Sequence, residues 1–118
     1  MTVDKYFEGK EESKRLFEAV HKVIKAFGAA EVRVTKSQVA FQRRKTFAWG
    51  WIPGKYLRRE AAPPVLTFSF PHKDASPPWK EVVETSPGRF THHLELYSTN
   101  DIDDQVRNWL KDAWIRAG

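Results

Sequence analysis

VRVTKSQVAFQRRKTFAWGWI, residues Val32 to Ile52, is the stretch that decides the fold of this chain. Apolar and polar residues alternate within short runs, which is the pattern of β-strands with one buried face. There are three such runs, Val32–Val34, Gln38–Gln42 and Thr46–Ile52. The breaks between them, Thr35–Ser37 and Arg43–Lys45, contain lysine or arginine and no large apolar residue. We therefore predict an antiparallel meander with cationic turns.

The third run separates large from small side chains. Period-two alternation places Phe47, Trp49 and Trp51 on one face, and Ala48, Gly50 and Ile52 on the other. Gly50 leaves room for the close approach of a helix or another backbone. We expect the tryptophans to belong to the core. The alternative is a solvent-facing aromatic shelf on which a base or another ring stacks.

Two further strands follow from the same alternation. Residues 65–70 and residues 89–97 both carry an apolar residue at every second position. In the second of these, His92 falls on the apolar side and His93 on the opposite side. Residues 79–84 fit either a short strand or a single turn, and the sequence leaves both open.

A helix is predicted on each side of the strands. Over residues 10–27, Leu16, Val20 and Ile24 form one apolar stripe, and Gly28 is a natural stop. After Asn100, which we expect to cap the second helix, apolar residues recur at the helical period as far as Trp114. This order predicts a single α+β domain over residues 1–118. It would be a two-layer sandwich with about five antiparallel strands, both helices packed on one face and the other face open.

Composition and charge limit the class of protein. The chain has no cysteine, so it has no disulfide and no thiolate metal site, and this fits a reducing cytoplasm. The N-terminus is charged and no apolar run approaches the ~20 residues of a membrane span, so we expect a cytoplasmic protein without a membrane partner. The net charge is +5, but residues 31–73 hold nine Lys or Arg against two acidic residues, a balance of +7. Such a region attracts phosphates or carboxylates, although a solvated, solubilising surface gives the same pattern.

The basic residues supply the candidate binding site. Lys36 and the Arg43–Lys45 group occupy turns at opposite ends of one strand, roughly 20 Å apart. The strand that follows runs back toward Lys36, so a loop carrying Arg58 and Arg59 would reach the same end and form a cleft with Lys36 and His93. The candidate ligand-binding residues are Lys36, Arg43, Arg44, Lys45, Arg58, Arg59 and His93.

Catalytic motifs are absent from the sequence. It contains no glycine-rich phosphate loop, no paired histidines around a glutamate on a helix, and no nucleophile elbow. We therefore predict no catalytic residue, no metal site and no cofactor, and a binding module for nucleic acid or for a phosphate- or carboxylate-bearing small molecule. The alternatives are a metal-handling or small enzymatic domain that uses His92, His93 or the N-terminal acidic residues, and an interaction module that docks through an exposed tryptophan face.

Four segments together resemble a known family. They are VRVTKSQVAFQRRKTFAW, WKEVVE, GRFTHHLEL and DIDDQVRNWLKDAW, within residues 7–114. The chain resembles an uncharacterised bacterial family known only as a domain of unknown function, which implies the fold and no activity. More loosely, the order of elements is similar to frataxin-like sandwiches, in which acidic residues of the first helix bind iron. Here the corresponding acidic residues are Asp4, Glu8, Glu11 and Glu12. Four basic residues interrupt this acidic series, namely Lys5, Lys10, Lys14 and Arg15.

Overall fold

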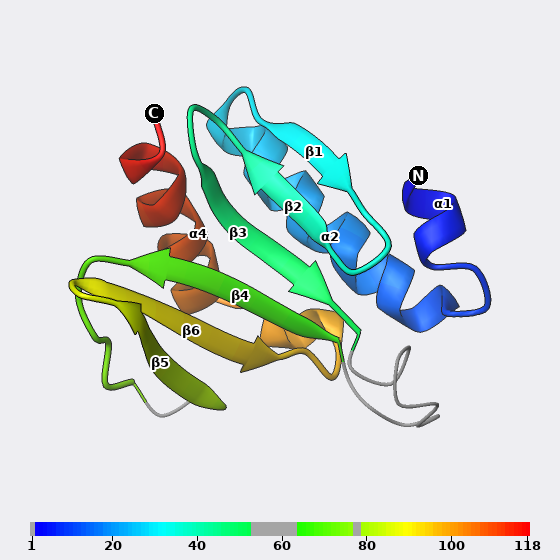
Figure 1. Ribbon diagram of the computed structural model, residues 1–118. Helices are drawn as coiled ribbons and strands as arrows, with labels where there is room; N and C mark the ends of the chain where they lie inside the picture. Colours follow the sequence, from blue (N-terminus) through cyan, green and yellow to red (C-terminus); the bar gives the residue numbers. More distant parts are fainter. Residues whose placement is uncertain (1, 53–63, 77–78) are drawn as a thin grey trace.

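The computed structural model describes residues 2–52, 64–76 and 79–118, and Figure 1 shows a sheet with helices behind it. The helical elements are α1 (Val3–Tyr6), α2 (Glu11–Phe27), the 3-10 turn η1 (Thr99–Asp101) and α4 (Asp104–Arg116). The strands are β1 (Glu31–Val34), β2 (Val39–Gln42), β3 (Thr46–Trp51), β4 (Val65–Phe70), β5 (Glu81–Ser86) and β6 (Arg89–Glu95). The predicted α+β sandwich is confirmed. Among the described residues, no helix has the length and apolar character needed to cross a membrane.

The sheet has six antiparallel strands in the order β1-β2-β3-β4-β6-β5, one more than the predicted five. The additional strand is β5, which covers most of the segment that the sequence left open between strand and turn. Its residues are mostly exposed, so it lacks the buried alternation by which the other strands were recognised. The predicted meander of β1, β2 and β3 is confirmed and continues into β4, and β1 and β5 form the two edges of the sheet.

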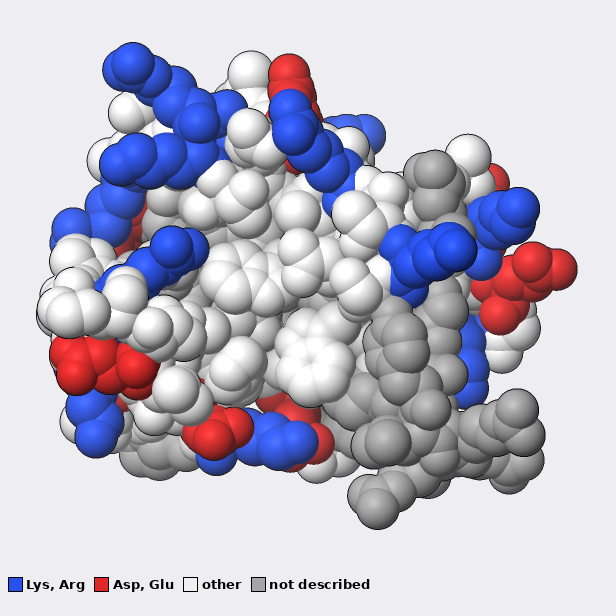
Figure 2. Space-filling view, in the orientation of Figure 1, with Lys and Arg blue, Asp and Glu red and all other residues white. Residues whose placement is uncertain are grey.

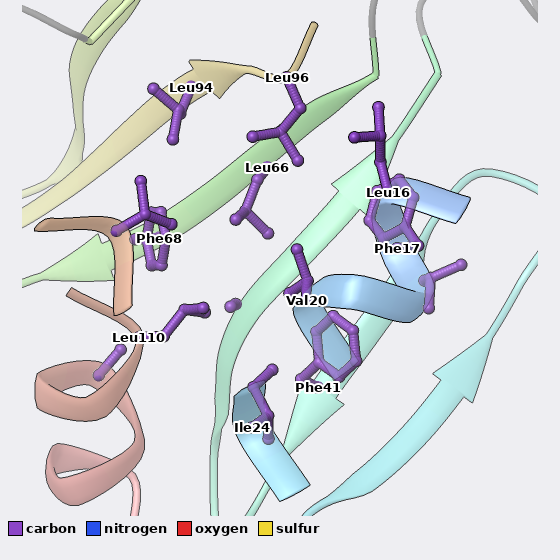
Figure 3. Close-up of a cluster of buried hydrophobic side chains, with 14 of the residues drawn as sticks. Leu16, Phe17, Val20, Ile24, Phe41, Leu66, Phe68, Leu94, Leu96 and Leu110 are labelled. Atoms are coloured by element: carbon purple, nitrogen blue, oxygen red, sulfur yellow. The ribbon is translucent and has the colours of Figure 1, made fainter. Parts of the chain in front are cut away.

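The main core lies between the sheet and the helices. α2 and α4 lie on the same face of the sheet, as predicted (Figure 1). Figure 3 shows side chains of α2, of the sheet and of α4 meeting in this layer, among them Val20, Phe41, Phe68 and Leu110. Gly50 allows α2 to approach β3, because a Cβ atom at Gly50 would lie only 1.6 Å from the Phe17 ring.

The three aromatic side chains of β3 do not all lie on one face of the sheet, although the alternation predicted that they would. Phe47 is buried in the main core, next to an irregularity in the β2–β3 register. Trp49 and Trp51 lie on the face opposite the helices, where they are half-buried. The expectation that these two tryptophans belong to the core is therefore wrong. The small side of β3 faces the helices, because it is the side that permits close packing.

Helix α4 begins later than the sequence suggested. Asn100 lies inside η1 and does not cap α4. The N-cap is Asp103, whose carboxylate accepts a hydrogen bond from the backbone N–H of Val106 at 3.0 Å. A separate capping box, formed by Ser98 and Asp101, closes η1. Asp101 and Asp103 thus belong to two separate helix caps a few residues apart, which explains why the sequence placed a single cap at Asn100.

Candidate functional site: a basic groove and an open sheet face

The predicted cationic residues do not form a single cluster. Lys36 lies in the β1–β2 turn and the Arg43–Lys45 group in the β2–β3 turn, so the length of β2 separates them, as the sequence predicted. His93 lies in the middle of β6 on the open face, paired with Thr67 of β4. Arg58 and Arg59 fall outside the described residues. The cleft predicted from Lys36, Arg58, Arg59 and His93 therefore stays a prediction.

Arg43 holds the end of α4. Its guanidinium lies 3.8 Å from the centre of the Trp114 ring, and its Nη1 donates to the Trp114 carbonyl oxygen at 2.9 Å. The backbone N–H groups of Arg44 and Lys45 donate to the Ala117 carbonyl at 2.9 and 3.3 Å. A cation at the C-terminus of a helix stabilises it by interacting with the last carbonyl groups. These contacts give Arg43 a structural role in docking α4.

A groove with three cationic side chains lies beside this contact. Lys45 from the β2–β3 turn, Arg89 from the start of β6 and Arg116 from the last turn of α4 line a cavity of about 710 Å³. Its described lining contains no acidic residue, and Phe47, Phe70 and Pro71 contribute apolar surface. In Figure 2, Lys and Arg side chains gather at the upper left, where Figure 1 has the β2–β3 turn and the C-terminus. We call this cavity the basic groove.

The three cations are held in different ways. Arg89 Nε donates to Ser69 Oγ at 2.9 Å, which orients the guanidinium from the side of the open face. Arg116 Nε donates to the Asp112 carboxylate at 3.0 Å, so its charge is partly balanced. Lys45 is exposed at the turn. An anion in the groove would meet Lys45 and Arg89 as its least compensated charges.

Sequence reasoning found Lys45 and missed Arg89 and Arg116. The three residues are far apart in the sequence and meet only because the hairpins and α4 end at the same place. The one available signal was position: Arg89 follows the turn at Gly88, and Arg116 lies in the last turn of a helix. Neither position is unusual for arginine, so the sequence did not distinguish them from a solvated surface.

The open face carries a second feature, a row of side chains across its middle strands. Trp49 of β3, Thr67 of β4 and His93 of β6 are neighbours in register, and Trp51 lies on the same face two residues after Trp49. Trp51 Nε1 donates to Thr67 Oγ1 at 3.3 Å, and Thr67 Oγ1 lies 2.9 Å from His93 Nδ1. We call Trp49, Trp51, Thr67 and His93 the platform.

Hydrogen bonds connect the side chains of the platform. Indole Nε1 is only a donor, so Thr67 Oγ1 accepts from Trp51, and the same oxygen shares a second hydrogen bond with His93 Nδ1. This contact occupies Nδ1 of His93 and leaves Nε2 as the other nitrogen of the ring. Burial lowers the pKa of His93, Glu81 opposes this shift and Lys80 adds to it. Thr67 is fully buried, so its hydroxyl orients His93 and has no access to a substrate.

His92 lies on the opposite face and is fully buried in the core. Its Nε2 accepts from the backbone N–H of Asp74 at 2.9 Å, and its Nδ1 lies 3.1 Å from the Phe90 carbonyl oxygen. Both nitrogens are therefore used internally, which fixes a neutral ring protonated at Nδ1. Burial lowers the pKa of His92, and the nearby Asp74 opposes the shift. Hydrogen bonds from Ser76, Trp79 and Trp109 lower the pKa of Asp74 to about 2.

This arrangement predicts that acid destabilises the fold. Below the ordinary histidine pKa of 6.5, the unfolded chain takes up protons that buried His92 does not, so the unfolded state binds more protons. The free energy of unfolding should stay level between pH 8 and 7 and fall as the pH drops below about 6.5 toward 5, by up to ~1.4 kcal/mol per pH unit for each such histidine. Urea unfolding at several pH values measures this slope.

The variant His92→Gln provides the comparison for that slope. A glutamine side chain offers an acceptor for the Asp74 N–H and does not titrate, so the variant should show a shallower slope than the wild type. An equal slope in both proteins would exclude His92 as the source.

The part of the chain that the structure describes contains no assembled set of metal ligands for the metal-handling alternative. No group of three or more His, Asp or Glu side chains there is placed to hold a metal ion. Of the N-terminal acidic residues, Asp4 pairs with Lys14 at 2.8 Å and Glu12 with Arg15 at 3.4 Å. The cations that interrupt the acidic series thus pair with two of its members.

The fold and this open face define a small two-layer α+β domain with a six-stranded antiparallel sheet. Residues 3–115 match the family described as a domain of unknown function, DUF5655. The chain belongs to that family, as the sequence resemblance indicated. The comparisons found no match among curated proteins or among solved structures.

Proposed function

We propose that this domain binds an anionic partner, with nucleic acid as the first choice, in the basic groove. One observation carries the proposal: Lys45, Arg89 and Arg116 come from three separate elements and line one cavity. Arginine presents a fork of N–H donors that suits phosphate or carboxylate, and lysine adds a point charge. A small molecule that bears phosphate or carboxylate groups is the second choice for the same groove.

Nucleic acid is favoured by the charge of the whole molecule. The chain carries a net charge of +5, and the segment that forms most of the sheet is its most basic part. A polyanion gains from this wider field as well as from the groove, whereas a small anion gains mainly from the groove. The sequence contains no catalytic motif that would add a reaction to the groove, so we propose binding as the activity.

The first test measures binding of a short labelled DNA strand as salt is raised from about 50 to 200 mM. Three phosphate contacts predict a slope of log K against log salt of roughly −2 to −3. Lys45→Ala and Arg89→Ala should each weaken binding roughly tenfold, because each removes one charge-assisted contact.

Lys25→Ala is the matched control, since it removes the same charge from an exposed position on α2. It should leave the affinity nearly unchanged. An equal loss in Lys25→Ala would show that only the overall charge matters, and an absence of binding at low salt would exclude nucleic acid. Tripolyphosphate that binds as tightly as the strand would favour a small anion.

A further inference from the structure

The basic groove and the platform lie next to each other. Ser69, which receives the Arg89 hydrogen bond, lies on β4 two residues from Thr67 and on the same face of the sheet. That separation is about 7 Å along the strand. The groove therefore opens beside the platform, at a distance that one nucleotide spans.

The platform presents aromatic surface without charge. Trp49 and Trp51 are half-buried on the open face, and Figure 2 shows a centre free of charged side chains, with mostly Lys and Arg along its upper border and both signs of charge along its lower border. Aromatic faces next to a group of cations are the arrangement with which proteins bind single-stranded nucleic acid: bases stack on the rings and phosphates lie on the cations. A duplex keeps its bases stacked inside and cannot use the rings.

His93 adds a directed polar contact at the edge of the platform. Its Nδ1 is engaged with Thr67, and within the described part of the chain its Nε2 has no protein partner. Side-chain nitrogens that are buried without a partner are not found there, so Nε2 reaches solvent. This nitrogen is available for a hydrogen bond with a polar group at the edge of a stacked base.

We propose that the preferred partner is single-stranded nucleic acid, with a base stacked on Trp49 or Trp51, its edge at His93 Nε2, and the adjoining phosphate in the basic groove. This inference rests on the proposed function and makes it specific. A single strand supplies a planar ring and an anion one nucleotide apart, which matches the separation of platform and groove. A docked protein would use the aromatic surface without needing the groove.

The experiment compares a labelled thymidine oligonucleotide with a duplex of the same length, by fluorescence anisotropy at low salt. The single strand should bind at least tenfold more tightly and should quench tryptophan fluorescence. Trp51→Ala should weaken single-strand binding roughly 5- to 150-fold, the range expected for loss of one stacked base. Trp51→Phe, which keeps a ring, should retain most of the affinity, and duplex binding should be unchanged in both variants.

Ile115→Ala is the control, because it removes an exposed apolar side chain from α4 and should leave binding unchanged. Circular dichroism of each variant checks that it is folded, and His93→Ala gives a second variant that leaves both rings in place and should weaken binding severalfold. Two outcomes would exclude base stacking on the platform: equal affinity for duplex and single strand, or unchanged binding in both Trp51→Ala and His93→Ala. Either outcome would still be compatible with anion binding in the basic groove. No binding of either nucleic acid would overturn both proposals.

Discussion

Replacing Gly50 with alanine is expected to destabilise the fold by about 3 kcal/mol. The new Cβ would lie 1.6 Å from Cε1 and 1.8 Å from Cζ of Phe17. The Phe17 ring is itself buried and packs against Phe7 with ring centres 5.0 Å apart, so it has no room to move aside. Removing a glycine from a strand gains only about 0.5–1 kcal/mol, so the steric cost dominates. Urea unfolding measures the difference.

The double variant Gly50→Ala/Phe17→Leu tests this explanation. Leucine lacks the two ring atoms closest to the new methyl group, so the double variant should be more stable than the sum of the two single changes predicts. A coupling of roughly 1–3 kcal/mol is expected for residues in such contact. Simple additivity would show that the cost of Gly50→Ala arises in the backbone.

The second large effect is expected from Phe68→Ala, with a loss of about 3–5 kcal/mol. Phe68 is fully buried on β4, and its ring contacts Trp79 and Trp109 with centres 5.6 and 6.5 Å away. Figure 3 shows it pointing into the layer between the sheet and α4. Truncation would leave a cavity that these surrounding rings cannot fill, and it would weaken the packing of α4. The thermal midpoint should fall by roughly 10–20 °C.

Val83→Ala serves as the control for this truncation. Val83 is 37% exposed on the edge strand β5, so its loss should change stability by less than about 0.5 kcal/mol. If Phe68→Ala were as mild as this control, the layer between β4 and α4 would contribute little to stability. Tryptophan fluorescence of Phe68→Ala reports the change around Trp79 and Trp109 directly.

The sequence predicted the fold well where apolar and polar residues alternate. The β1–β4 meander and β6 show a clear period of two, and Gly50 was recognised as the point of close approach. β5 was ambiguous because an exposed edge strand has little apolar pattern. Trp49 and Trp51 were separated correctly from the small residues of β3, but Phe47 lies on the helix side because the β2–β3 register shifts next to it. Which face met the helices depends on the fit of Phe17 against Gly50, and residue type alone favoured burying the tryptophans.

The candidate site was less predictable because it is assembled from distant segments. Lys45 was identified from the charge of its turn, yet Arg43 in the same turn serves α4 by stacking on Trp114. Arg89 joins the groove through the hairpin between β5 and β6, the part of the sheet that the sequence left open. Local composition therefore indicated a basic region, and the pairing of strands decided which of its members share a cavity.

The bonds that join the β2–β3 turn to Ala117 have a consequence for ligand binding. Lys45 and Arg116 line the groove from the two sides of this junction, so the groove has its full shape only while the last turn of α4 is docked. Helix ends fray at small energetic cost, and any ligand that needs the docked state favours it. Ligand binding and docking of the carboxyl end of the chain are then coupled. Docking raises the affinity of the groove for its ligand, and the bound ligand raises the equilibrium constant for docking by the same factor.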